Sequence, residues 1–109
     1  MEDRVEISLL MGLYGSLLTE KQCSIMDLYY NEDLSLAEIA ELNQTSRQAI
    51  HDLIKRCYKQ FLTYEGKLML LKKSLEREKK IAEILDDIDR KYSIDKVDYN
   101  KYKEILEEL

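Results

Sequence analysis

The sequence predicts an all-α protein, and three observations favour this fold class. The 109 residues contain no proline and only three glycines, so the frequent turn residues of a sandwich or barrel are missing. Hydrophobic residues make up 45% of the chain and charged residues 36%, a balance that excludes a disordered chain. Apolar residues recur three and four positions apart, as on one face of a helix. We expect a helix-turn-helix domain over residues 1–66, with its motif at 35–62, and a helical arm over residues 67–109.

Two helices are expected before the motif. The first covers residues 4–18, where Val5, Leu9 and Leu13 fall on one side. The second begins after Thr19-Glu20-Lys21-Gln22, a capping box in which the threonine hydroxyl and the glutamine side chain each satisfy a free backbone N–H. It extends to about Tyr30, because the polar residues that follow favour bonds to their own backbone.

The motif itself is expected from Ser35 onward. Ser35-Leu36-Ala37-Glu38 is a second capping box, and it opens a short helix over residues 36–42. Residues 43–45 form the turn, with Asn43 as the residue best suited to a left-handed backbone. Ala40 is small enough for a close helix crossing. Ser46 caps the next helix, whose inner stripe is Ile50, Leu53, Ile54, Cys57, Phe61 and Leu62.

The opposite face of this next helix is the candidate DNA-binding surface. Arginine and glutamine near the start of a recognition helix can contact base edges, and the later cations can neutralise phosphates. The candidate residues are Arg47, Gln48, His51, Lys55, Arg56 and Lys59. The alternative is an ordinary solvated helix face, since Asp52 lies in its middle. The net charge of −5 excludes a globally basic nucleic-acid binder, but it does not exclude a local basic face.

Several of these segments carry a resemblance. Leu18-Thr19-Glu20-Lys21-Gln22, the segment Leu34–Ala40, and Ser46-Arg47-Gln48-Ala49-Ile50 together resemble DNA-binding region 4 of bacterial sigma factors. The segment Ser46–Arg56, followed by Tyr64-Glu65-Gly66-Lys67-Leu68, resembles the YlxM family of small bacterial helix-turn-helix proteins. That resemblance implies the fold and a regulatory role in the signal recognition particle pathway, through its components as partners.

The remainder of the chain is expected to form an arm. Residues 67–91 contain no helix breaker, so one long helix is predicted, followed by a short helix from about Tyr99 with Asp98 as its N-cap. The apolar residues of the long helix recur at heptad spacing, with a second apolar row beside them. They would need burial on the domain or on a partner. A homodimer is the simplest use, through Leu68, Leu71, Leu75, Ile81, Ile84, Leu85 and Ile88.

Catalysis, cofactor chemistry and metal binding are not expected. The single histidine His51 cannot complete a four-ligand zinc site with Cys23 and Cys57, and no phosphate loop or nucleophile elbow is present. We interpret both cysteines as small hydrophobic residues in a reducing compartment. No run of 18 apolar residues occurs, and the acidic start lacks a signal peptide's basic lead, so we expect a cytoplasmic protein with neither membrane contact nor a small-molecule substrate.

Two functional hypotheses follow. The first is a regulatory protein that binds DNA through residues 47–59. The second is an adaptor of the same fold that binds signal recognition particle components without DNA.

Overall fold

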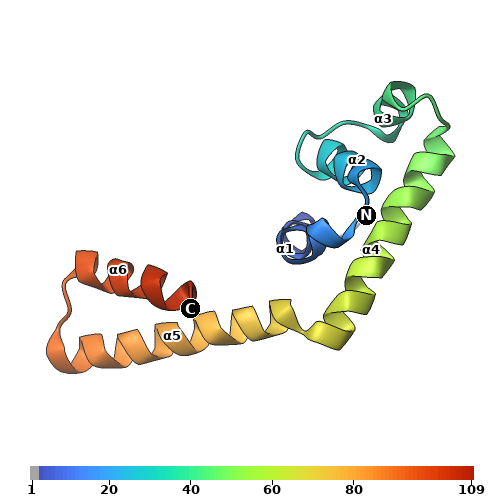
Figure 1. The fold of residues 1–109 in the computed structure, drawn as a ribbon. Coiled ribbons are helices and arrows are strands. Elements are labelled where there is room, and N and C mark those ends of the chain that lie inside the picture. The colour runs from blue at the N-terminus through green and yellow to red at the C-terminus, as the bar shows by residue number, and fades with distance from the viewer. Residues whose placement is uncertain (1–2) are drawn as a thin grey trace. The chain divides into compact units, whose positions relative to one another are not determined.

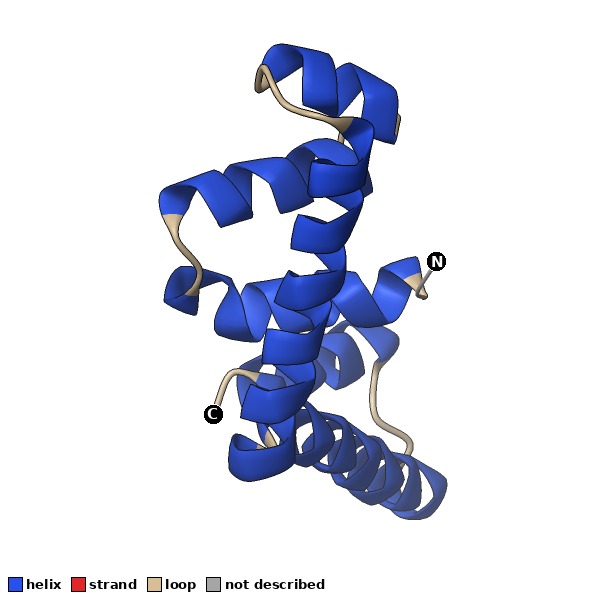
Figure 2. Cartoon of the chain, turned by 90° about the vertical axis from the view of Figure 1, so that its right-hand side faces the viewer, coloured by secondary structure: helices blue, strands red, loops and turns tan. Residues whose placement is uncertain are grey.

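The computed structural model describes residues 3–109, and within this range every regular element is a helix (Figures 1 and 2). The all-α prediction is confirmed. The elements are α1 (Arg4–Tyr14), the 3-10 turn η1 (Gly15–Leu17), α2 (Glu20–Tyr30), α3 (Leu36–Leu42), α4 (Arg47–Leu68), α5 (Leu70–Tyr92) and α6 (Lys96–Glu107). The contacts divide the chain into a unit that ends at Leu71 and a second unit that begins at Lys72.

The first unit is organised around α4. Helices α1, α2 and α3 each pack against it, as Figure 1 shows. The buried side chains of this core are hydrophobic and come from all four helices: Ile7, Leu10, Tyr14, Ile25, Met26, Ile39, Ala40, Ile50, Ile54, Cys57 and Phe61. Burial of this apolar surface is the main stabilising term of the unit.

Side-chain caps fix where α2 and α3 begin. Thr19 Oγ1 accepts from the N–H of Gln22 at 3.2 Å, while Gln22 Oε1 accepts from the N–H of Thr19 at 3.0 Å. Ser35 and Glu38 form the same reciprocal pair, with both bonds at 3.1 Å. Both capping boxes predicted from the sequence are therefore present. The predicted first helix is too long, because α1 ends at Tyr14 and the chain tightens into a 3-10 turn up to Leu17.

The long helix expected over residues 67–91 is present as α5, but it starts at Leu70 and is not continuous from residue 67. Met69 adopts a left-handed backbone with φ of 54°, so α4 ends at Leu68 and a separate helix starts at Leu70. Tertiary hydrogen bonds hold the break. Glu65 Oε1 accepts from the N–H of Leu71 at 2.9 Å and from the hydroxyl of Tyr14 at 2.6 Å, and that hydroxyl accepts from the N–H of Leu70 at 3.3 Å. Two of the first N–H groups of α5 are thereby satisfied by side chains from α1 and α4.

The Tyr14 hydroxyl therefore acts inside the molecule. Its ring is fully buried against the core. Burial, followed by the hydrogen bond to Glu65, raises the pKa of the Tyr14 phenol. The neutral phenol can donate to the carboxylate and accept from the backbone at once, which explains why a tyrosine suits this position.

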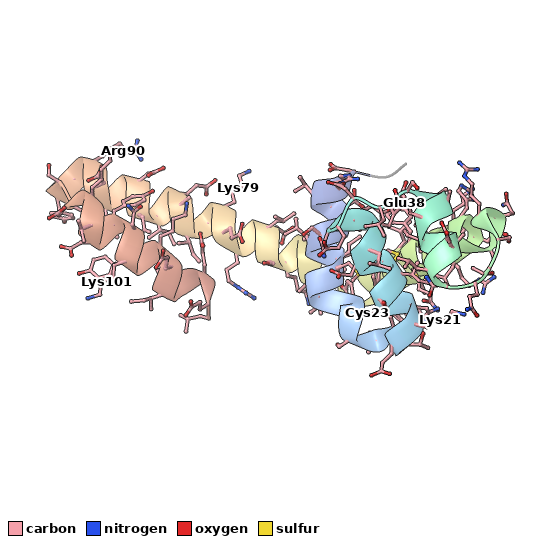
Figure 3. All side chains as sticks on the ribbon, turned by 90° about the horizontal axis from the view of Figure 1, so that it is seen from above. Lys21, Cys23, Glu38, Lys79, Arg90 and Lys101 are labelled. Carbon is pink, nitrogen blue, oxygen red and sulfur yellow. The ribbon has the colours of Figure 1, made fainter. Side chains whose placement is uncertain are left out.

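In the second unit, α6 folds back beside α5 as an antiparallel helical hairpin (Figures 1 and 3). The Tyr99 hydroxyl donates to Asp86 Oδ1 at 2.5 Å across the pair, and Asp89 Oδ1 accepts from the N–H of Ile94 at 2.9 Å in the connection. The N-cap of α6 is Asp95, which accepts from the N–H of Val97, so the helix starts earlier than expected and Asp98 lies inside it.

None of the helices within residues 3–109 combines the length and the apolar character that a membrane span requires.

Candidate nucleic-acid interface

The turn between α3 and α4 sets the direction of the candidate recognition helix. The N–H of Thr45 donates to the carbonyl of Ala40 at 3.0 Å, and the N–H of Gln44 donates to the carbonyl of Glu41 at 3.2 Å. This pair of bonds is a Schellman motif, in which the residue after the helix cap is left-handed. That residue is Gln44, with φ of 52°, rather than the expected Asn43. Asn43 instead donates from Nδ2 to the carbonyl of Ile39 at 2.8 Å.

The start of α4 is fixed by Ser46, whose Oγ accepts from the N–H of Ala49 at 3.0 Å. From there, one face of the helix is buried through Ile50, Ile54, Cys57 and Phe61, each at most 1% exposed. This spacing of four, three and four residues matches the helical period, so the residues between them are directed to solvent. Leu62, expected on the inner stripe, is 44% exposed and lies outside it.

The structure places five of the six predicted contact residues on the exposed face of α4. His51 is half-buried, and the exposed residues are Arg47, Gln48, Lys55, Arg56 and Lys59. They form two adjacent rows along the helix, since residues four apart lie above one another. Asp52, Lys55, Arg56 and Lys59 line one surface pocket.

The cations of this face carry no charge partner in the described part of the chain. The ion pairs found over residues 3–109 involve Arg4, His51, Arg90, Lys91 and Lys103, so none of Arg47, Lys55, Arg56 and Lys59 is neutralised at 4 Å or closer. A fixed helix with four unpaired cations on one face is able to bind an anion without first breaking internal ion pairs.

Asp52 is held by a neighbour on its own helix. Gln48 donates from Nε2 to Asp52 Oδ1 at 2.9 Å, while His51 Nδ1 lies 3.7 Å from the same oxygen, too far for a hydrogen bond. The amide of Gln48 is therefore engaged in this structure, and it would have to leave Asp52 to reach a ligand. Sequence reasoning missed this bond, although the four-residue spacing of a glutamine and an aspartate is its signal.

Charge is distributed unevenly around the interface. Helix α4 carries five basic and two acidic residues, a net charge of +3. Residues 1–46, which include α1, α2 and α3, carry two basic and nine acidic residues, a net charge of −7. The basic surface of this unit is therefore a property of α4 alone.

The predicted dimerisation residues divide into two groups. Ile81 and Leu85 are buried within a single chain, at 8% and 4% exposure, and Leu71 packs on the edge of the N-terminal core. The remaining four are exposed: Leu68, Leu75, Ile84 and Ile88. Only this second group is available for another molecule.

Comparison with known proteins shows the family to which the chain belongs. Residues 1–105 match the family model described as "UPF0122: Putative helix-turn-helix protein, YlxM / p13 like". The chain belongs to the UPF0122 family. A UPF0122 protein of Clostridium botulinum (strain Alaska E43 / Type E3) is 67% identical over 109 residues, which is all of both chains. A UPF0122 protein of Clostridium perfringens (strain SM101 / Type A) is 56% identical over 110 residues, covering all of this chain and 97% of the relative.

The family assignment agrees with the resemblance to YlxM proteins and with the α3–turn–α4 geometry. A more distant UPF0122 protein, from Clostridium acetobutylicum, is 50% identical over 111 residues and covers all of this chain and 92% of its own length. The family match extends over both units, because it includes α5 and most of α6.

Proposed function

We propose that this UPF0122 protein is a non-enzymatic regulatory protein that binds duplex DNA through the exposed face of α4. The observation that carries the proposal is a set of four cations on that face, at the second helix of a helix-turn-helix, none of which forms an ion pair with a residue in the described range 3–109. Arg47 and Gln48 lie in the first turn of α4, where recognition helices contact base edges. Lys55, Arg56 and Lys59 follow at the spacing of a helix face and would neutralise phosphates.

A salt titration tests this proposal. The full chain binds labelled duplex DNA in a fluorescence anisotropy assay, and the logarithm of its affinity is plotted against the logarithm of the salt concentration. The variant with Arg47→Ala and Lys55→Ala loses a base-edge contact and a phosphate contact. Loss of the phosphate contact of Lys55 makes the slope shallower by about 0.9. Binding of the variant at the lowest salt is weaker than that of the native chain.

A matched control removes the same charge elsewhere. Lys21 on α2 and Lys101 on α6 are exposed and lie outside the interface (Figure 3). The variant with Lys21→Ala and Lys101→Ala keeps the native slope under this proposal. Equal slopes for all three proteins, or no duplex binding by the native chain at low salt, would overturn it.

A second candidate is favoured by the acidic half of the first unit. Residues 1–46 carry a net charge of −7. In a DNA-bound helix-turn-helix, the helix before the recognition helix usually lies against the phosphate backbone, where acidic residues are unfavourable. An acidic surface is suited to a basic protein partner. In this candidate the chain is an adaptor that binds components of the signal recognition particle, the pathway implied by its resemblance to the YlxM family.

The two candidates are separated by running both titrations side by side. If the adaptor function holds, particle components bind the native chain and the Arg47→Ala, Lys55→Ala variant equally, and the DNA duplex does not bind at any salt concentration. If DNA binding holds, the duplex responds to that variant as described above. We further propose that the protein acts in the cytoplasm as a homodimer, so that one dimer presents two copies of α4.

A further inference from the structure

The hairpin of α5 and α6 has too little core to stand alone. The second unit, from Lys72 to Leu109, contains no cysteine, and Ile81 and Leu85 are the only buried hydrophobic residues among its described residues. Independent units of about 40 residues or fewer usually need a disulfide, a metal or another chain to be stable. The hairpin therefore needs further apolar contact.

The apolar surface that could provide this contact lies on one side of the hairpin. On α5, Ile84 and Ile88 flank the buried row of Ile81 and Leu85, and they are 57% and 37% exposed. On α6, Tyr102 and Ile105 flank the half-buried row of Tyr99, Lys103 and Leu106 in the same rotational sense. At about 100° per residue, equal offsets on two antiparallel helices fall on the same side of the pair.

This side is large enough for a dimer interface. Its apolar members are Ile84, Ile88, Tyr102 and Ile105, which we call the hairpin face. With side-chain areas of roughly 150–250 Å² and the exposures found here, they present on the order of 400 Å² per chain. A stable interface buries about 800 Å² per partner, of which a little over half is apolar, so the hairpin face supplies most of the apolar part.

Charges at the two ends of the hairpin face differ in sign. Arg77 precedes Ile84 and Ile88 by seven and eleven residues, so it shares their row at one end. Asp98 precedes Tyr102 and Ile105 by four and seven residues, at the end next to the connection. Over residues 3–109, neither Arg77 nor Asp98 takes part in an ion pair. Two copies placed head to tail bring the basic end of one face against the acidic end of the other.

We infer that the hairpin faces of two copies of this chain pack together in antiparallel orientation and form a four-helix bundle. The inference deepens the homodimer of the proposed function and is independent of DNA binding. A symmetric interface of this kind uses the same patch on both copies, which a single self-complementary face can satisfy. The bundle would bury the isoleucines of the hairpin face at its centre.

Sedimentation velocity of the full chain, without DNA, tests the inference. The native chain sediments as a dimer at tens of micromolar. The variant with Ile84→Asp and Ile105→Asp sediments as a monomer, with a dimer dissociation constant at least 100-fold higher, because four charges would enter the apolar interface. Both side chains are more than half exposed in the single chain, so circular dichroism of the variant retains the native helix content.

A matched control and a charge exchange complete the test. Lys79 and Arg90 are exposed on the side of α5 that is directed away from the hairpin face, and both are labelled in Figure 3. The variant with Lys79→Asp and Arg90→Asp stays dimeric. Arg77→Glu alone and Asp98→Lys alone each weaken the dimer several-fold, and the double variant in one chain restores it.

Three results would overturn the inference. A native chain that is monomeric at 100 micromolar removes the dimer altogether. A dimer that survives Ile84→Asp with Ile105→Asp places the interface elsewhere. A double charge variant that is no better than the single ones excludes the antiparallel orientation. None of these three sedimentation results depends on whether the chain binds DNA.

Discussion

At the scale of single residues, Gln44 is one of four non-glycine residues within residues 3–109 that adopt a left-handed backbone, with φ of 52°. The left-handed conformation costs a residue with a Cβ atom roughly 1–2 kcal/mol, and glycine adopts it without that cost. Gln44 holds it because the Schellman bonds to Ala40 and Glu41 end α3 there. Replacing Gln44 with glycine is therefore expected to stabilise the fold by about 0.5–1 kcal/mol, after the greater entropy of glycine in the unfolded chain is subtracted.

Urea unfolding measures this change. The variant Gln44→Ala, which keeps the Cβ atom, serves as control and stays within about 0.5 kcal/mol of the native protein. A glycine variant that is less stable than the alanine variant would show that Gln44 is not strained.

Glu38 makes the stability of α3 depend on pH. The N–H of Ser35 donates to the Glu38 carboxylate, and this bond, followed by the side chain of Ser35, lowers the pKa of Glu38. A depressed pKa in the folded state contributes stability that is fully present above the unfolded-state pKa and is lost as the pH falls through the folded-state pKa.

Between pH 5.5 and 3, the native protein is therefore expected to lose more stability than Glu38→Gln, whose amide oxygen can still accept from Ser35. The urea midpoint measured across this range checks the expectation. Glu41→Gln, on the same helix and outside the cap, should follow the native curve. A native curve parallel to that of Glu38→Gln would contradict the assignment.

At the scale of elements, helix boundaries that depend on local signals could be predicted, and a boundary that depends on a distant contact could not. Thr19, Ser35 and Ser46 each cap a helix at the position that the sequence indicates, because a capping bond is made within four residues. The end of α4 at Leu68 depends on Tyr14, which is 51 residues distant from Glu65 in the chain. A contact between residues so far apart has no signal in the local sequence, and residues 67–71 contain no proline or glycine that would predict the end of a helix.

The junction between α4 and α5 gives an element-scale prediction. Tyr14→Phe keeps the buried ring but removes the hydroxyl that bonds Glu65 and the N–H of Leu70. Because two hydrogen bonds are lost in a partly buried site, the urea midpoint is expected to fall by about 0.5 M. Hydrogen exchange at Leu70 is expected to accelerate in the same variant.

Tyr92→Phe provides the comparison for this change, since Tyr92 is highly exposed and its hydroxyl forms no hydrogen bond with another residue of the described range 3–109. Its midpoint and exchange rates should match those of the native chain. A hydrogen-exchange rate at Leu70 that is the same in Tyr14→Phe as in the native chain would show that the hydroxyl does not stabilise the junction.

At the scale of the whole molecule, net charge conceals the feature on which the proposed function depends. The chain carries −5 overall, and the family match to a helix-turn-helix describes its fold, yet α4 alone carries +3. The sequence could predict the candidate residues of α4, because helical spacing separates Arg47, Lys55 and Lys59 from the buried stripe. It could not predict that these cations lack ion-pair partners among residues 3–109, since that depends on where distant carboxylates lie in space.

The most direct test of the central claim is a nuclear magnetic resonance titration of the full chain with a short DNA duplex at low salt. If α4 binds the duplex, backbone and side-chain signals from Arg47 to Lys59 shift, with the largest changes at the exposed positions of α4, and signals of α1 and α2 stay in place. Shifts confined to residues outside α4, or no shifts at saturating duplex, would contradict the central claim.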